Sequence, residues 1–386
     1  MFEELERLQD SFINDYGIPG NDCIVLKDGK VVYRRFAGYS DLENRIPMNG
    51  KEIYNIYSCS KPITAAAGMQ LIEKGVIRLE DPLYEYIPEY RNVYVHTGGE
   101  LVPDPAFPKR VTRVGGEFVP AKNVITIKDL FCMTAGFSYD TDAKCFKELW
   151  DETDGRCPTV EAARALAKEP LLFEPGAQWE YSLCLDVLAA VIEIASGKRF
   201  GEYVRENIFE PLDMKDSTFL LPAEKLDAVC AQYQCDIFTR EMKNCGKEIN
   251  NVDCRCHPYK IGSEYESGGA GCISTLEDYV KFMEALRKGG VILSKETTDL
   301  MTTDMLNAQQ KKTFWQAGYS YGLGVRVPDP KQGTTDFGWS GAAGAYMAID
   351  RINGITFYYA QHVLFSKILD MRADLYSAAR RALTGR

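Results

Sequence analysis

The most informative stretch of the sequence is residues 57–75, which read Tyr57-Ser58-Cys59-Ser60-Lys61-Pro62-Ile63-Thr64-Ala65-Ala66-Ala67-Gly68-Met69-Gln70-Leu71-Ile72-Glu73-Lys74-Gly75. Residues 65–67 and 71–74 are good helix formers and Gly75 is a typical stop, so the stretch predicts a helix. Ser58 lies at or beside its N-terminus, where free N–H groups and the helix dipole favour developing negative charge. Lys61 follows three residues later and therefore shares a helix face with Ser58.

This pattern indicates a serine nucleophile with a lysine base, because a hydroxyl, an amine and a helix N-terminus meet at one place. The alternative is that Ser58 only caps the helix, since serine is common at that position and Ser-x-x-Lys also occurs by chance. The rest of the chain is needed to choose between the two interpretations.

The composition is typical of a water-soluble globular protein. The 386 residues are 45% hydrophobic and 26% charged, with a formal net charge of −10. The acidic balance argues against nucleic acid or an anionic membrane as a partner. Residues 187–195 form the most hydrophobic stretch and are too few to cross a bilayer. Residues 1–8 form an acidic amphipathic helix start without the features of a signal peptide, so we expect a cytoplasmic location, with a trimmed export signal left open.

The twelve cysteines are expected to be reduced structural thiols. Five of them lie close together in the sequence and are followed by a histidine: Cys230, Cys235, Cys245, Cys254, Cys256 and His257. Their spacing matches no paired zinc motif, and disulfides are not expected without export. A metal site at this cluster is the alternative, but we expect no metal or other cofactor.

Strand-like segments lie near both ends of the chain, at 23–27, 30–36, 344–350 and 355–360, and helix-like segments fill much of the middle. This order predicts a sheet built from the two ends with a helical lobe inserted between them. We place the sheet domain at residues 1–75 and 275–386 and the mainly helical lobe at residues 76–274.

Two further motifs agree with the Ser58-Cys59-Ser60-Lys61 motif, namely Tyr181-Ser182-Leu183 and Trp339-Ser340-Gly341. In order and approximate separation, the three motifs resemble those of the serine beta-lactamase and penicillin-binding protein superfamily, on the class C and DD-peptidase side. The resemblance covers nearly the whole chain, with Ser267-Gly268-Gly269-Ala270-Gly271 among the supporting stretches. It implies an α/β (α+β) fold of the beta-lactamase/transpeptidase type, with an antiparallel sheet flanked by helices, a helical lobe and the active site between them.

The resemblance also implies roles for individual residues. Ser58 would be the nucleophile that forms an acyl-enzyme, while Lys61 and Tyr181 would manage the protons, and which of these two is the formal base stays open. Serine needs such help because it must lose its proton as it attacks, and a lysine with an ordinary pKa is nearly all protonated at neutral pH. The oxyanion hole would be formed by the backbone N–H groups of Ser58 and Ala342.

Two departures from the family pattern bear on the substrate. Leu183 stands where asparagine is usual, and Trp339 stands where lysine or histidine is usual. Without that cation a substrate carboxylate has no obvious partner, while leucine and tryptophan offer apolar contact that suits an ester or acyl chain. We therefore expect Leu183, Trp339, Ser340 and Gly341 to contact the substrate. The pattern is similar to that of the carboxylesterases and acyltransferases of the superfamily.

The sequence therefore predicts a carboxylesterase-like serine hydrolase that acts on small esters or amides. The alternatives are a beta-lactamase or a D-amino-acid-specific peptidase such as a DD-carboxypeptidase, an acyltransferase, and a binding protein without catalysis. The natural substrate and the oligomeric state cannot be read from the sequence.

A competing interpretation is a classical α/β-hydrolase. Gly318-Tyr319-Ser320-Tyr321-Gly322 matches G-x-S-x-G, and Asp350 and His362 follow in the required order. A nucleophile elbow must turn from a strand into a helix, whereas residues 323–328 continue as a strand, so we set this interpretation aside. The three histidines, His96, His257 and His362, are then expected to be structural.

Overall fold

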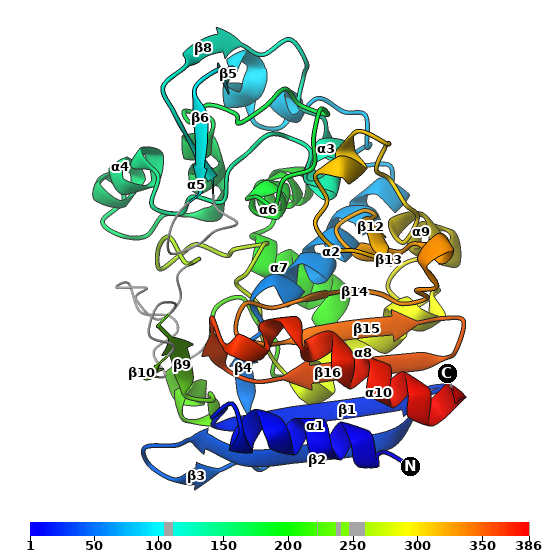
Figure 1. Cartoon of the computed structure of the whole chain (residues 1–386). Helices are drawn as coiled ribbons and strands as arrows, with labels where there is room; N and C mark the ends of the chain where they lie inside the picture. The colour runs from blue at the N-terminus through cyan, green and yellow to red at the C-terminus, as the bar shows by residue number, and fades with distance from the viewer. Residues whose placement is uncertain (104–110, 222, 237–240, 247–258, 386) are drawn as a thin grey trace.

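The computed structural model describes residues 1–103, 111–221, 223–236, 241–246 and 259–385 (Figure 1). Its main feature is an eight-stranded antiparallel sheet with the strand order β12-β13-β14-β15-β16-β1-β2-β3. The strands are β1 (Gly20–Lys27), β2 (Lys30–Asp41), β3 (Ile46–Pro47), β12 (Tyr319–Tyr321), β13 (Arg326–Pro328), β14 (Phe337–Ser340), β15 (Tyr346–Asp350) and β16 (Ile355–Ala360).

The two ends of the chain meet in the middle of this sheet, where β1 pairs with β16 from Asp22 opposite Ala360 to Lys27 opposite Ile355. Side chains alternate between its faces. Cys23 and Val25 join a core with α1 (Glu3–Asn14) and α10 (Arg372–Thr384). Ile24 and Leu26 join the larger core, which includes residues of α8 (Leu276–Lys288). The sheet is therefore covered by helices on both faces, with α1 and α10 side by side in front and α8 behind (Figure 1).

Helix α2 (Ser60–Glu73) is buried from Ser60 to Leu71. Helices α6, α7 and α9 contact it, α3 and α5 pack on α6, and α4 packs on α5. Their bounds are α3 (Ile127–Cys132), α4 (Lys144–Glu152), α5 (Thr159–Leu166), α6 (Cys184–Ser196), α7 (Phe200–Val204) and α9 (Lys295–Met301). Thr126 caps α3 with a complete capping box, in which its hydroxyl accepts from the Asp129 N–H and the Asp129 carboxylate accepts from the Thr126 N–H.

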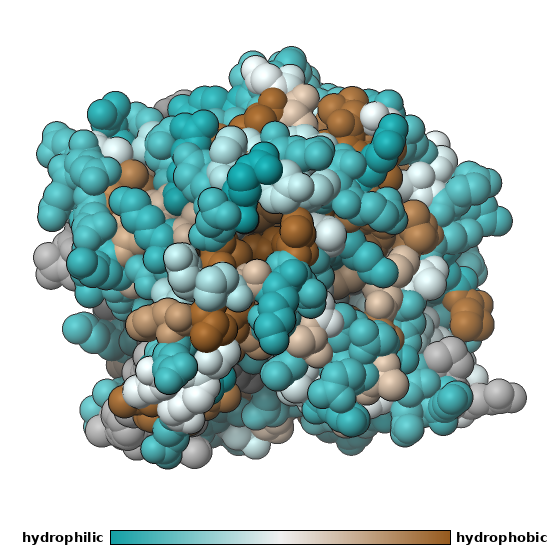
Figure 2. Space-filling view, turned by 90° about the horizontal axis from the view of Figure 1, so that it is seen from above, coloured by the Kyte–Doolittle hydropathy of each residue, from teal (hydrophilic) through white to brown (hydrophobic). Residues whose placement is uncertain are grey.

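Four smaller sheets complete the structure. Two hairpin-like pairs join β5 to β8 and β6 to β7, a third pair joins β11 to β4, and a three-stranded sheet has the order β10-β9-β17. The strands are β4 (Ile53–Asn55), β5 (Tyr94–Thr97), β6 (Glu100–Pro103), β7 (Val111–Val114), β8 (Glu117–Pro120), β9 (Gln232–Cys235), β10 (Met242–Gly246), β11 (Ile273–Thr275) and β17 (Val363–Leu364). Seen from above, the helical end of the molecule is largely hydrophilic, with hydrophobic residues gathered around a hollow near its middle (Figure 2).

The predicted fold class is confirmed: an antiparallel sheet is flanked by helices, and further helices lie beside it. The strands of the large sheet come from residues 20–47 and 319–360, and the middle of the chain adds small sheets to its helices. The domain boundaries at residues 75 and 275 stay a prediction. Among the described residues, no helix is both long enough and apolar enough to cross a membrane.

Candidate active site

Ser58 lies at the start of the buried helix but not within it. It occupies a 3-10 turn, Tyr57–Cys59, directly before α2. Tyr57 has a left-handed backbone with a φ of +48°, and its buried phenol donates a hydrogen bond to the Gln232 side chain. Such a conformation costs about 1–3 kcal/mol in a residue other than glycine and persists only where the surroundings hold it. The turn leaves Ser58 7% exposed, while Lys61 is fully buried.

Lys61 is held at three hydrogen-bond acceptors. Its Nζ donates to the Gly269 carbonyl oxygen at 2.8 Å, and to Ser58 Oγ and the Tyr139 hydroxyl at 3.3 Å each. Burial lowers the pKa of Lys61 to about 7, although the negative charge of Asp186 opposes that shift. A substantial fraction of Lys61 is therefore neutral near pH 7, which is what a general base requires.

Tyr181 lies on the other side of the serine. Its hydroxyl donates to Ser58 Oγ at 2.5 Å, and its ring stacks on that of Tyr139 with centroids 5.0 Å apart. Burial raises the pKa of Tyr181, while hydrogen bonds with Ser58 and Trp339 oppose the shift. The phenol is therefore neutral at ordinary pH and can donate a proton. The structure thus brings Ser58, Lys61 and Tyr181 together, and their chemical roles stay predictions.

Sequence reasoning missed two aromatic residues beside this trio. Tyr139 contacts Lys61 and Tyr181 from the loop after α3, and no motif distinguished it among 22 tyrosines. Trp315 is 39% exposed and lies edge-on to Tyr181, with centroids 5.4 Å apart. It belongs to an aromatic cluster around Tyr181, whose members are Tyr139, Trp179, Phe314, Trp315, Tyr321 and Trp339.

The end of β14 approaches the serine turn closely. A Cβ on Gly341 would collide with the carbonyl oxygen of Ile56, so the missing side chain permits this approach. Glycine at position 341 is therefore needed for close packing of two backbone segments, whereas we expected Gly341 to contact the substrate. Arg372 fixes the following turn by donating to the carbonyl oxygens of Gly341 at 2.7 Å and Ala345 at 3.0 Å. Within the described chain, the N–H groups of Ser58 and Ala342 have no hydrogen-bond acceptor, as oxyanion donors should.

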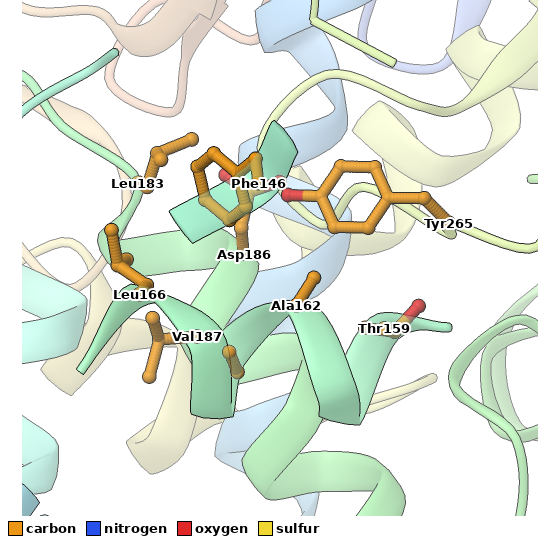
Figure 3. Close-up of a pocket in the computed structure, with 9 residues that line it drawn as sticks. Phe146, Thr159, Ala162, Leu166, Leu183, Asp186, Val187 and Tyr265 are labelled. Atoms are coloured by element: carbon orange, nitrogen blue, oxygen red, sulfur yellow. Dashed lines mark hydrogen bonds between the residues drawn. The ribbon is translucent and has the colours of Figure 1, made fainter. Parts of the chain in front are cut away.

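The other residues that we expected to contact the substrate differ in how exposed they are. Ser340 and Ala342 are partly exposed beside the serine turn. Trp339 is 2% exposed and stacks on Tyr181 at 5.9 Å, so it supports the phenol more than it forms an open surface. Leu183 is also 2% exposed and lines a small internal cavity with Asp186 (Figure 3). The apolar side chain turns into the core, which differs from our expectation that Leu183 would face a substrate.

The residues of the competing α/β-hydrolase interpretation do not form a triad. Ser320 lies in β12 and donates to Asp304 at 2.5 Å, Asp350 binds Asn353 and Thr335, and His362 binds the Cys230 carbonyl. Of the cysteine cluster, Cys230 and Cys235 are buried, while Cys254, Cys256 and His257 lie outside the described residues. No group of residues suited to a metal ion is found in the part of the chain that the structure describes.

The structure combines a helix-flanked antiparallel sheet, a Ser-x-x-Lys motif and a tyrosine hydrogen-bonded to the serine. This combination defines the class of active-site serine proteins to which beta-lactamases belong. The comparison with family models agrees, since the model described as Beta-lactamase matches residues 5–376. The chain belongs to the beta-lactamase family.

Relatives that the chain resembles include a protein named as an esterase and one named as an acyltransferase. Esterase EstB of Burkholderia gladioli is 27% identical over 372 residues, covering 91% of this chain and 88% of EstB. Acyltransferase mokF of Monascus pilosus is 28% identical over 330 residues, covering 81% of this chain and 73% of mokF.

Two solved structures share the fold across nearly the whole chain. EstCE1, a hydrolase with promiscuous acyltransferase activity, has a TM-score of 0.74 at 21% identity and covers 97% of both chains. Simvastatin synthase (LovD) from Aspergillus terreus has a TM-score of 0.79 at 20% identity and covers 100% of this chain and 98% of its own. The predicted beta-lactamase family is confirmed, while the carboxylesterase branch stays a prediction with which the name of EstB agrees.

Proposed function

We propose that the protein is a serine hydrolase that cleaves small esters through an acyl-enzyme at Ser58. The observation that carries the proposal is the position of Ser58 Oγ, which lies 3.3 Å from Lys61 Nζ and 2.5 Å from the Tyr181 hydroxyl. A nucleophile within reach of two proton-transfer groups is the arrangement that acyl transfer needs.

In acylation, Ser58 Oγ attacks the ester carbonyl carbon, and its proton passes to neutral Lys61, directly or through Tyr181. The N–H groups of Ser58 and Ala342 bind the oxyanion that forms. The oxyanion then collapses, the bond to the alcohol breaks, and the departing oxygen takes a proton from Tyr181 or Lys61. In deacylation a water molecule repeats the sequence and releases the carboxylic acid, with the same groups acting in reverse.

The aromatic cluster supports an ester of apolar character as the substrate. Trp339 occupies the position at which the family usually has a cation, and the exposed Trp315 edge borders Tyr181. Aromatic side chains contribute large apolar contact areas but no charge for a substrate carboxylate. The esterase name of the relative EstB agrees with this choice.

The test compares p-nitrophenyl esters of several acyl lengths with a chromogenic cephalosporin and with D-amino-acid amides. We expect ester turnover that Ser58→Ala removes and that Ser377→Ala, a substitution of a serine on α10 far along the chain, does not change. Strong cephalosporin turnover with negligible ester hydrolysis would contradict the proposal and favour a beta-lactamase. No turnover of any substrate and no labelling of Ser58 would favour a binding protein.

Acyl transfer is a second candidate because the relative mokF is named an acyltransferase. Both activities share the acyl-enzyme and differ only in whether water or an alcohol accepts the acyl group. Adding a primary alcohol to the p-nitrophenyl ester reaction separates them: a transferase yields the new ester and releases p-nitrophenol faster, whereas a strict hydrolase yields only the acid.

A further inference from the structure

Asp186, on the first turn of α6, is a buried carboxylate behind the site that the reaction above does not use. It is 5% exposed. Its Oδ1 accepts hydrogen bonds from the Tyr265 hydroxyl at 2.8 Å, Ser267 Oγ at 2.5 Å and the Gly269 N–H at 3.3 Å. Three donors on one oxygen hold the carboxyl group in a fixed position behind Lys61. Figure 3 shows the Tyr265 hydroxyl directed at Asp186 across the small cavity.

Gly269 connects this carboxylate to Lys61. Its N–H donates to Asp186, and its carbonyl oxygen accepts the shortest of the Lys61 hydrogen bonds, at 2.8 Å. A Cβ built on Gly269 would collide with Asp186 Oδ2 and would lie 3.3 Å from Lys61 Nζ. The carboxylate and the amine therefore approach the same point, within the roughly 4–6 Å over which one charge shifts the pKa of another.

The second carboxylate oxygen strengthens this interpretation. Asp186 Oδ2 is buried and has no hydrogen-bond partner among the described residues, while Oδ1 of the same carboxylate accepts three hydrogen bonds. A buried carboxylate in a region of low dielectric acts strongly on a nearby cation. The glycine at position 269 of the stretch 267–271 therefore leaves room for the Asp186 carboxylate beside the Lys61 amine.

We propose that Asp186 is a positioning residue that sets the protonation of Lys61 through Gly269 and thereby fixes the pH range in which Ser58 reacts. The inference rests on the proposed function, in which Lys61 acts as the base. Without the carboxylate, buried Lys61 would lose its proton too readily and would be a weaker base at neutral pH.

Other groups near Lys61 and Asp186 could also affect the protonation of the amine. The amine is surrounded by Ser58 and Cys59 from the serine turn, Tyr139 from the loop after α3, Tyr181, and Cys184 at the start of α6, and Tyr265 faces the carboxylate. Burial raises the pKa of the tyrosines and of both cysteines, so they are neutral at pH 5–8. Glu180 differs, because burial raises its pKa to about 7, which falls in the same range as Lys61.

The test follows Lys61 by NMR in protein labelled with 13C at lysine Cε, with the resonance assigned by its loss in Lys61→Arg. Asp186→Asn removes the charge at nearly constant shape, and we expect the Lys61 titration to move to lower pH by at least about 1 unit. The acidic limb of the pH profile for p-nitrophenyl ester turnover should move in the same direction, with a lower plateau. Asp186→Ser is a second neutral variant, smaller than asparagine, should Asp186→Asn not fold.

Matched controls separate charge from structure. Asp186→Glu keeps the charge, so its titration should stay close to that of the wild type, and Glu180→Gln should leave the Lys61 resonance unmoved. An Asp186→Asn or Asp186→Ser protein that folds but titrates as the wild type does overturns the inference, as does a shift to higher pH. Failure of the proposed function gives a different result, namely no ester turnover and no labelling of Ser58 by a fluorophosphonate, while the Lys61 titration still responds to Asp186.

Discussion

Tyr181 brings a neutral phenol to the serine. Because burial holds its pKa above the ordinary value, the hydroxyl proton is present throughout the pH range in which Lys61 titrates near 7. The two groups are therefore complementary at neutral pH, one able to accept a proton and the other able to donate one. Stacking on Tyr139 and Trp339 keeps the phenol oxygen directed at Ser58 Oγ.

Removing the Tyr181 hydroxyl should therefore affect turnover more than binding. Tyr181→Phe keeps the ring and its stacking, so we expect kcat for p-nitrophenyl esters to fall by about 10²–10⁴-fold, the usual contribution of a proton-transfer group, with little change in KM. Steady-state kinetics checks this result. Tyr203→Phe, which removes a buried phenol on α7, is the control, and near wild-type turnover in Tyr181→Phe would contradict the role.

At the scale of single residues, the sequence motifs located Ser58, Lys61 and Tyr181, because each sits at a fixed place relative to a helix start. Tyr139 was not found, since its position depends on how a loop without a motif returns to the site. Leu183 was expected to face a substrate, but whether a residue at a helix start points outward or inward depends on tertiary packing. Residues in loops and at element ends are therefore the ones for which structure adds most.

Among the elements, the connection between β14 and β15 is shaped by a helix that follows it in the chain. Arg372, the first residue of α10, is buried, and its guanidinium donates to carbonyl oxygens on both sides of Ala342, at Gly341 and Ala345. These bonds fix the peptide groups around the Ala342 N–H. The orientation of one expected oxyanion donor thus depends on a helix outside the active-site motifs.

Arg372→Met should accordingly lower catalysis. The methionine retains apolar bulk but removes the charged donor from two carbonyl oxygens, which keep only the backbone N–H groups of Gly344 and Gly341, so we expect kcat to fall by about tenfold, less than the direct loss of an oxyanion donor. Stability should also fall, by about 1.5–3 kcal/mol, the usual contribution of hydrogen bonds to a charged group. Ester kinetics and thermal unfolding measure the two effects separately.

Arg381→Met on the same helix is the control for this substitution. Arg381 pairs with Glu4 at the surface, where an ion pair contributes about 0–1 kcal/mol, and it does not reach the β14–β15 connection. A kcat in Arg372→Met equal to that in Arg381→Met would contradict the role assigned to the guanidinium.

The helix around residues 60–73 was predicted from its composition, with Ser58 at or beside its start, and the structure places Ser58 in a 3-10 turn directly before α2. The sequence did not predict the left-handed backbone of Tyr57 in this turn. Nothing in a tyrosine predicts a positive φ, and the hydrogen bond from its phenol to Gln232, at the start of β9, depends on the tertiary fold. A short 3-10 segment likewise precedes the last helix, which begins at Arg372.

For the whole molecule, His362 links segments that are far apart in the chain. Its Nδ1–H donates to the Cys230 carbonyl at 2.8 Å, and its Nε2 accepts from the Asn55 N–H at 3.3 Å. Both ring nitrogens are used by the neutral imidazole, and burial lowers the pKa of His362 to about 4. Protonation would remove the acceptor of the Asn55 N–H and place a charge in the core.

The low pKa of His362 makes the stability of the folded protein fall in acid. An unfolded histidine has a pKa of about 6.5, so between pH 6.5 and 4 the unfolded state binds more protons than the folded state. The stabilisation is fully present above pH 6.5 and is lost as the pH falls toward 4, by about 3 kcal/mol in total. Denaturant unfolding of wild type and His362→Gln should therefore differ more at pH 7.5 than at pH 4.

His96→Gln, a substitution on β5, is the control for that comparison. Its pH dependence of stability should match that of the wild type, whereas His362→Gln should lose part of the slope between pH 6.5 and 4. A slope in His362→Gln equal to the wild-type slope would assign the acid sensitivity to other groups.

The overall architecture was predictable because strand patterns at the two ends and three motifs in a fixed order pointed to the same fold. The pairing of β1 with β16 was harder to predict from the sequence, since it joins residues more than 300 positions apart and depends on register. The glycines and prolines of residues 91–122 indicate a long connection or a small hairpin, and the sequence did not show that β5 to β8 pair there as two small sheets.

The two edges of the eight-stranded sheet have a consequence for how copies of the protein behave in concentrated solution. One edge strand, β12, has three residues, and the other, β3, has two, of which the second is Pro47. An edge of this kind offers few free backbone N–H and C=O groups to a strand from another molecule. The β12 edge of the large sheet therefore presents little template for edge-to-edge polymerisation into fibres, whereas at the other edge β3 pairs with β2 only at Tyr39 and Asp41 and leaves most of the twelve residues of β2 beyond its reach.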